Sequence, residues 1–144
     1  MKKVIIGIGN PLKKDDNIGN IIVEKLKKRT KDQDLMFVRA ETNPENYISK
    51  IKEFEPGVIY FIDAAEFDGE AGEIRVFQID DVLNESLSTH GISVKIFRNF
   101  FPETEIRIIG IKVEDTNYGE GLSRELEKNK NNLTENISKI LSQV

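Results

Sequence analysis

The stretch that decides the fold is Met1-Lys-Lys-Val-Ile-Ile-Gly-Ile-Gly-Asn-Pro-Leu-Lys-Lys-Asp-Asp-Asn-Ile18. Its continuous apolar run, Val4 to Ile8, is typical of a buried parallel strand. Gly9-Asn10-Pro11 predicts a turn, and the apolar residues that follow recur at helical spacing. We therefore expect a strand that passes, through a loop carrying Asp15-Asp16, into a helix over residues 16–28. In open α/β sheets, ligands bind at the carboxyl ends of the strands, where this loop would lie.

Length and composition place limits on the rest of the protein. The chain has 144 residues, no cysteine and a formal net charge of −4. This length is typical of one domain with a substantial core, so we expect a single domain over residues 1–144. Without cysteine there are no disulfides, thiolate metal sites or cysteine nucleophiles, and a reducing compartment is consistent with that absence. The first apolar run is too short for a signal peptide or a membrane span. We expect a cytoplasmic protein without membrane insertion, and a monomer is the simplest expectation.

Strands and helices alternate along the remainder of the chain. Runs that predict further strands cover residues 35–40, 58–62, 73–77 and 106–113. Helices are predicted to begin near Thr42, Ser88 and Leu122, whereas residues 79–87 indicate loop or broken helix. The segment 73–77 alternates polar and apolar residues, as an edge strand does. The sequence therefore predicts a three-layer α/β sandwich, with a mostly parallel five-stranded sheet, helices on both faces and one antiparallel or edge strand.

Two helix starts carry local capping signals. Asp15 or Asp16 is expected to cap the first helix, where its carboxylate would also favour the helix dipole. Thr42 and Glu45 have the spacing of a capping box, and Pro44 falls just inside the first turn. If Asp15 is only a cap, replacing it should cost about 0.5–2 kcal/mol of stability.

Polar side chains from three places in the sequence fall at one rim of the predicted sheet. The Asp15-Asp16 pair follows the first strand, Asp63 ends the third, and His90, the only histidine, stands where a later helix begins. Two carboxylates and one imidazole suit a divalent first-row metal such as nickel or zinc, and three protein ligands leave positions open for water or substrate. Each of these residues also suits a purely structural role as a helix cap or turn former.

Other enzyme patterns are incomplete. The glycines of Gly7-Ile8-Gly9 suggest a dinucleotide fingerprint, but its third glycine would fall at Leu12. No Gly-x-Ser-x-Gly elbow is present, and a single histidine cannot form a His-Glu-x-x-His metal site. The positive charges are scattered, so we expect no nucleic-acid surface.

Four ordered motifs resemble the maturation proteases of nickel-iron hydrogenases, nearest the branch that serves hydrogenase 3 and other formate-hydrogenlyase-type enzymes. They are Gly7-Ile-Gly-Asn-Pro-Leu-Lys-Lys-Asp-Asp-Asn-Ile-Gly19, Thr42-Asn-Pro-Glu-Asn46, Ile62-Asp-Ala-Ala65 and Leu87-Ser-Thr-His-Gly91. The resemblance implies a phosphorylase/hydrolase-like fold. It also implies an endopeptidase that removes the C-terminal extension of a nickel-loaded hydrogenase large-subunit precursor. In this family, Asp16, Asp63 and His90 would be the catalytic residues and would also contact the nickel bound in the precursor.

The same resemblance implies a substrate-recognition loop at Thr42, Asn43, Pro44 and Glu45. Glu41 stands where the family usually has glycine, and Asn17 replaces another common glycine. Two alternatives to the protease remain: a nickel-binding chaperone that recognises the precursor without cutting it, and peptidyl-tRNA hydrolase. The latter shares the Gly-x-Gly-Asn-Pro start but needs an early histidine and a basic surface. For the protease, either an aspartate or the metal would activate the attacking water.

Overall fold

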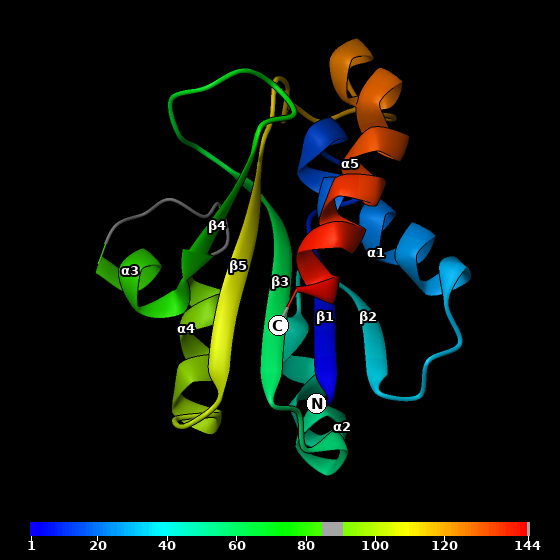
Figure 1. Ribbon diagram of the computed structural model, residues 1–144. Helices are drawn as coiled ribbons and strands as arrows, with labels where there is room; N and C mark the ends of the chain where they lie inside the picture. Colours follow the sequence, from blue (N-terminus) through cyan, green and yellow to red (C-terminus); the bar gives the residue numbers. More distant parts are fainter. Residues whose placement is uncertain (85–90, 144) are drawn as a thin grey trace.

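The computed structural model describes residues 1–84 and 91–143, and its strands form one five-stranded sheet (Figure 1). The strands are β1 (Lys3–Ile8), β2 (Leu35–Glu41), β3 (Val58–Ala65), β4 (Ile74–Gln78) and β5 (Glu105–Lys112). Their order is β2-β1-β3-β5-β4; β4 is antiparallel to β5, and the other pairs are parallel. The predicted mostly parallel sheet and its edge strand are confirmed.

Helices cover both faces of this sheet. They are α1 (Ile18–Arg29), α2 (Ile48–Phe54), α3 (Ile79–Asn84), α4 (Gly91–Phe100) and α5 (Arg124–Ser142), and the 3-10 turns η1 (Lys14–Asn17) and η2 (Pro44–Tyr47) precede α1 and α2. On one face, Ile22 of α1 and Ile137 of α5 share a core with Ile62 of β3. On the other, Phe97 of α4 packs edge-on against Phe61, with ring centroids 4.9 Å apart. The predicted three-layer sandwich is confirmed.

The apolar pattern of each strand follows from its place in the sheet. Val4 to Ile8 and the whole of Val58–Ala65 are buried because β1 and β3 are central strands covered by helices on both faces. Along the edge strand β4, Arg75 and Val76 are exposed whereas Ile74 and Phe77 are half-buried. β1 and β3 run side by side in parallel, so their carboxyl ends meet at one edge of the sheet.

The starts of the first two helices differ from the capping predictions. Asp15 and Asp16 both lie within η1, and α1 begins later, at Ile18, without a side-chain cap. The capping-box prediction is also wrong, because the Thr42 hydroxyl donates to Asn43 Oδ1 at 3.0 Å and no side chain caps η2. Asp15 instead bonds to residues far away in sequence, and Asp16 accepts a hydrogen bond from Asn10 in its own loop.

Two remaining predictions concern the later part of the chain. The segment predicted as loop or broken helix begins with α3, and residues 85–87 lie outside the described residues. The long C-terminal helix is confirmed as α5. Within residues 1–84 and 91–143, no helix is both long enough and apolar enough to cross a membrane.

Candidate active site

The loop after β1 holds Asp16 at the carboxyl edge of the sheet. Asp16 is only 5% exposed, and its Oδ2 accepts a hydrogen bond from the Asn10 backbone N–H at 2.8 Å. Its own N–H donates to the Lys13 carbonyl at 2.9 Å, which closes the turn. Gly9 is required here, because a Cβ at that position would lie 1.9 Å from the Asp16 carbonyl oxygen. The loop is therefore compact, and the Asp16 carboxylate has a fixed direction.

A second glycine brings the start of α1 onto the sheet. A Cβ on Gly19 would lie 2.1 Å from the Ile62 carbonyl oxygen and 2.4 Å from that of Ile8. Only glycine allows this approach. Since Ile8 is the last residue of β1 and Ile62 lies near the end of β3, Gly19 places η1 directly against both strand ends, and η1 packs on β3.

Asp63 lies on β3 at the same edge of the sheet. It is fully buried and follows Ile62, whose pairing with Gly7 is the last between β1 and β3. On its other side, Asp63 is in register with Gly110 of β5. The topology therefore brings Asp16 and Asp63 to the carboxyl ends of neighbouring strands, the position that the sequence predicts for them.

His90, the third predicted site residue, lies outside the described residues. In sequence it directly precedes α4, which packs on the sheet face opposite α1. Within the described ranges, no group of three or more His, Cys, Asp or Glu residues is arranged to hold a metal ion. The metal-contact prediction thus depends on Asp16 and Asp63 together with a residue that the structure does not describe.

Asp15 makes contacts quite different from those of a helix cap. Its buried carboxylate accepts hydrogen bonds from the N–H groups of Glu114 and Asp115, at 3.0 and 2.9 Å. It also accepts from the N–H and the hydroxyl of Ser123, at 2.6 and 2.7 Å. We call these four residues the Asp15 clamp. The clamp ties η1 to the loop after β5 and to the residue that precedes α5.

No motif pointed to Asn20, yet it is a fully buried polar side chain beneath the site. Its amide donates to the Gly9 carbonyl and to Asn17 Oδ1, both at 2.8 Å, and its Oδ1 accepts from the Glu41 N–H at 3.1 Å. Asn20 therefore holds the loop after β1 against the loop after β2. The sequence does hold one sign that Asn20 is buried: it is a single polar residue among the apolar residues that open α1.

The predicted recognition loop follows β2 at the same edge. Thr42 and Asn43 are exposed and Pro44 is buried. The Asn43 side chain donates to Glu45 Oε1 at 3.0 Å, whereas Glu45 Oε2 is buried and has no hydrogen-bond partner within the described chain. Buried acceptors are nearly always paired. Glu45 thus has one acceptor position that the described residues leave unused.

Glu41 joins β2 to this loop in a left-handed conformation, with φ of 55°. This conformation costs a residue with a Cβ about 1–2 kcal/mol but costs glycine little. The exposed side chain contributes only a loose ion pair with Arg39, at 3.5 Å. The left-handed backbone at position 41 therefore explains why the family that the motifs resemble usually has glycine there.

Replacing Glu41 with glycine is expected to raise the free energy of unfolding by about 0.5–1 kcal/mol, because the relief of strain exceeds the entropy that glycine adds to the unfolded chain. Thermal denaturation followed by circular dichroism should show a melting temperature about 1–4 °C higher. Glu41→Gln is the matched control: it removes the charge but keeps the Cβ, and should leave the melting temperature unchanged. A lower melting temperature for the glycine variant would contradict the strain.

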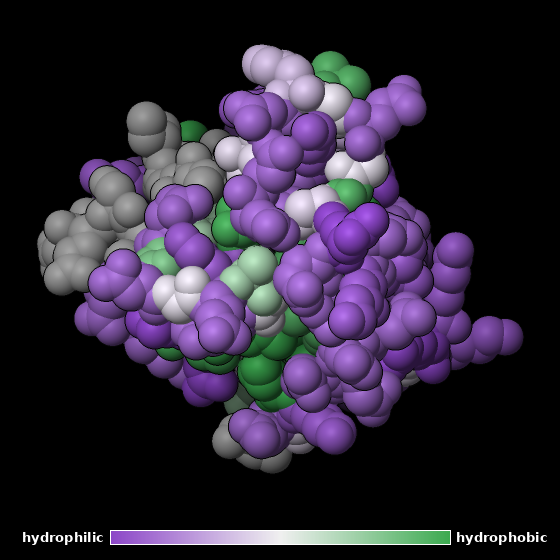
Figure 2. Space-filling view, turned by 90° about the horizontal axis from the view of Figure 1, so that it is seen from above, coloured by the Kyte–Doolittle hydropathy of each residue, from purple (hydrophilic) through white to green (hydrophobic). Residues whose placement is uncertain are grey.

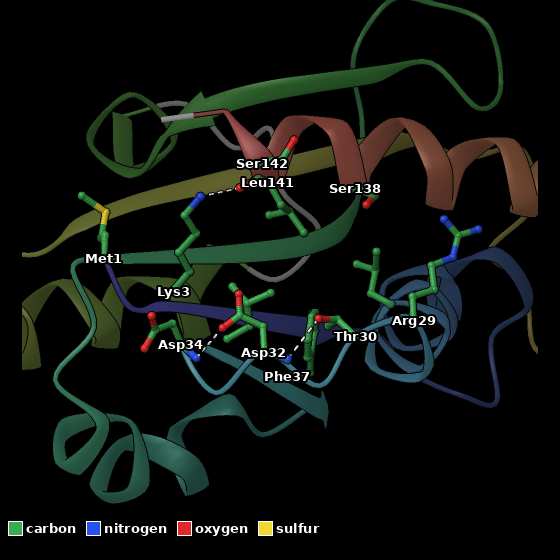
Figure 3. Close-up of a pocket in the computed structure, with 12 residues that line it drawn as sticks. Met1, Lys3, Arg29, Thr30, Asp32, Asp34, Phe37, Ser138, Leu141 and Ser142 are labelled. Carbon is green, nitrogen blue, oxygen red and sulfur yellow. Dashed lines mark hydrogen bonds between the residues drawn. The ribbon is translucent and has the colours of Figure 1, made fainter.

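A separate cavity of about 510 Å³ opens at the opposite edge of the sheet, where β1 and β2 begin (Figure 3). Lys3, Leu35 and Phe37 of these strands line it, together with Arg29 at the end of α1 and Leu141 near the end of α5. Neither of the candidate catalytic aspartates reaches it. We therefore place the candidate active site at the carboxyl edge and not in this cavity.

Solved structures with the same architecture define the class of protein. The crystal structure of the NiFe hydrogenase maturation protease HycI from Thermococcus kodakarensis KOD1 superposes with a TM-score of 0.82 and 32% sequence identity, over 99% of this chain and 93% of that one. The arrangement of strands and helices around the carboxyl edge is therefore that of a peptidase that matures hydrogenases.

Sequence comparisons identify the family. Residues 21–140 match the HycI family, described as Hydrogenase maturation protease. The Methanocaldococcus jannaschii protein MJ0631 is 36% identical over 121 residues, covering 77% of this chain and 72% of that protein. The Hydrogenase 3 maturation protease of Escherichia coli K12 is 27% identical over 115 residues, covering 78% and 73%. The chain belongs to the hydrogenase maturation protease family and is a protease, as its motifs predict. Neither the chaperone nor the peptidyl-tRNA hydrolase alternative is supported.

Proposed function

We propose that this protein removes the C-terminal extension from the precursor of a nickel-iron hydrogenase large subunit. Asp16, Asp63 and His90 contact the nickel already bound in that precursor. The observation that carries the proposal is the pair of buried aspartates at the ends of β1 and β3 in a chain of this protease family. The metal belongs to the substrate, so the protein needs no resident ion.

The reaction is the hydrolysis of one peptide bond. Water loses a proton as it adds to the carbonyl carbon, the C–N bond breaks, and the leaving amine takes up a proton. Asp16 or Asp63 accepts the proton from water and returns it to the amine. The nickel of the precursor supplies Lewis acidity to the carbonyl or to the water. Both carboxylates are buried, and Asp16 is the slightly more exposed of the two, at 5% against 0%.

The loop of Thr42, Asn43, Pro44 and Glu45 recognises the precursor in this proposal. Its exposed polar residues lie at the same edge as Asp16, and Glu45 Oε2 can accept a hydrogen bond that no described residue makes. Asn20 links Glu41, which directly precedes this loop, to Gly9 in the loop of Asp16, and so holds the two loops side by side. The single-domain organisation, the monomeric state and the cytoplasmic location stay predictions from the sequence.

Nickel-free precursor is expected to remain uncut, because the contacts to the metal hold the scissile bond at the site. The mass of the purified precursor, measured before and after incubation with the protein, should fall by the mass of the extension only when nickel is present. The nickel-free precursor is prepared by removing nickel with a chelator. Adding nickel back to it should restore cleavage, which excludes damage to the substrate. Equal cleavage with and without nickel would contradict the metal contact, and no cleavage of either form would contradict the choice of substrate.

A further inference from the structure

Leu12 and Tyr118 form an exposed pair of large side chains at the carboxyl edge. Viewed from above, onto the end where the parallel strands finish, the surface is mostly hydrophilic (Figure 2). Leu12 is nevertheless 68% exposed and Tyr118 is 75% exposed. Their loops are bonded to each other, since the Gly119 N–H donates to the Leu12 carbonyl at 2.9 Å and the Lys14 N–H donates to the Gly119 carbonyl at 3.3 Å. Two segments distant in sequence thus carry two exposed large side chains on loops that are bonded to each other, and we call this pair of residues the Leu12–Tyr118 platform.

Hydrogen bonds and a cation–π contact fix the two loops that carry the platform, and we call these loops its frame. The Leu12 N–H donates to Asn10 Oδ1 at 2.9 Å, and the Lys13 ammonium lies 5.3 Å from the centre of the Tyr118 ring, within cation–π distance. Below it, the Asp15 clamp anchors both loops. A surface that is ordered before binding loses little conformational entropy when a partner arrives. Exposed apolar and aromatic side chains on such a frame are suited to anchoring another protein.

The same frame carries the candidate catalytic carboxylate. Asn10 fixes Leu12 through its side chain, and its backbone N–H donates to Asp16 Oδ2. The position of Leu12 relative to Asp16 is therefore set by hydrogen bonds within one short loop. An open polar groove of about 640 Å³ lies in the same region. It is lined by Asn117, the neighbour of Tyr118 in sequence, and by Glu114, Asp115, Thr116, Ser123 and Arg124.

We propose that the Leu12–Tyr118 platform binds the precursor polypeptide next to the bond that is cut, through an apolar side chain of the precursor, and that the adjoining polar groove takes the neighbouring stretch of its backbone. This proposal rests on the proposed function. Three metal-contacting side chains cover far less than the roughly 800 Å² per partner that a specific complex buries, so the precursor needs further contacts. The Leu12 side chain and the Tyr118 ring are the exposed groups here, and an apolar side chain matches them, whereas Lys13 beside the ring disfavours a cationic one.

Leu12→Ser and Tyr118→Ser, made singly and together, test the platform. Both side chains are exposed, so the variants should keep the melting temperature of the unmodified protein. The double variant is expected to raise KM for nickel-loaded precursor about tenfold, with kcat within about twofold. Phe100→Ser is the matched control, because Phe100 is 47% exposed but ends α4 before β5 begins, at the opposite edge. It should leave both constants unchanged.

Binding of the same precursor, measured by biolayer interferometry, gives a second readout that does not need cleavage. The dissociation constant should also rise about tenfold in the double variant. An unchanged KM and dissociation constant would overturn the platform, and so would a loss confined to kcat. If the unmodified protein binds the precursor tightly but never cuts it, the proposed function fails, and a tenfold weaker binding by the double variant would still support the platform as a docking surface. Absence of binding by the unmodified protein contradicts both.

Discussion

Replacing Asp16 with asparagine is expected to abolish cleavage of nickel-loaded precursor while the protein stays folded. The amide has nearly the same shape, and its oxygen can still accept the hydrogen bond from the Asn10 N–H. It cannot, however, take a proton from water, and it is a weaker ligand for a divalent metal. We expect the cleavage rate to fall about a hundredfold or more. His90→Ala should have the same effect, since His90 is the only histidine in the chain.

The test is the rate of release of the C-terminal extension, measured by mass spectrometry alongside a melting curve for each variant. Asp68→Asn is the matched control: it removes the same charge from an exposed carboxylate in the loop after β3, near the same edge. This control should cleave at the normal rate. Normal cleavage by Asp16→Asn or by His90→Ala would remove that residue from the proposed site.

Replacing Asp15 with asparagine is expected to destabilise the protein by about 3 kcal/mol, well beyond the effect of a lost cap. The carboxylate accepts four hydrogen bonds in a fully buried position, and asparagine keeps only one oxygen for them. Its NH₂ group would face an N–H donor and leave that donor unpaired. For a chain of this size the melting temperature should fall by about 6–12 °C.

Asp115→Asn separates this effect from a general loss of charge. Asp115 is partly exposed and pairs with Lys14 at 3.0 Å. The Asn117 backbone N–H and the Lys14 ammonium lower the pKa of the Asp115 carboxyl. Solvent screens exposed pairs of this kind, so they contribute little to stability and the melting temperature should change little. A fall for Asp15→Asn no greater than that for Asp115→Asn would contradict the structural role of the clamp.

The sheet could be predicted because its signals are local. β1 and β3 are covered on both faces, and apart from Lys3 and Asp63 their sequences are accordingly almost continuously apolar. β4 lies at an edge, where Arg75 and Val76 are exposed while Ile74 and Phe77 are half-buried. Once the strands are known to be parallel, the positions of Asp16 and Asp63 follow from where their strands end.

The contacts of the polar residues could not be predicted in the same way. The partners of Asp15 lie in residues 114–123, so the local pattern that suggested a helix cap carries no trace of them. The same holds for Asn20 in α1, because its partner Glu41 belongs to strand β2, 21 positions further along the chain. Capping rules consider only the N–H groups of the helix that follows the side chain. Asp15 instead accepts four hydrogen bonds from residues 114–123, which are distant in sequence.

Asp15 and Ser123 are separated by 108 positions, which couples the site to the completion of the chain during synthesis. When the first strand leaves the ribosome, the donors for the Asp15 carboxylate have not yet been made. β5, which lies between β3 and β4, also arrives late. Contacts of such long separation form late in folding. We therefore expect the loop that carries Asp15 and Asp16 to reach its final position only after residues 114–123 have been made.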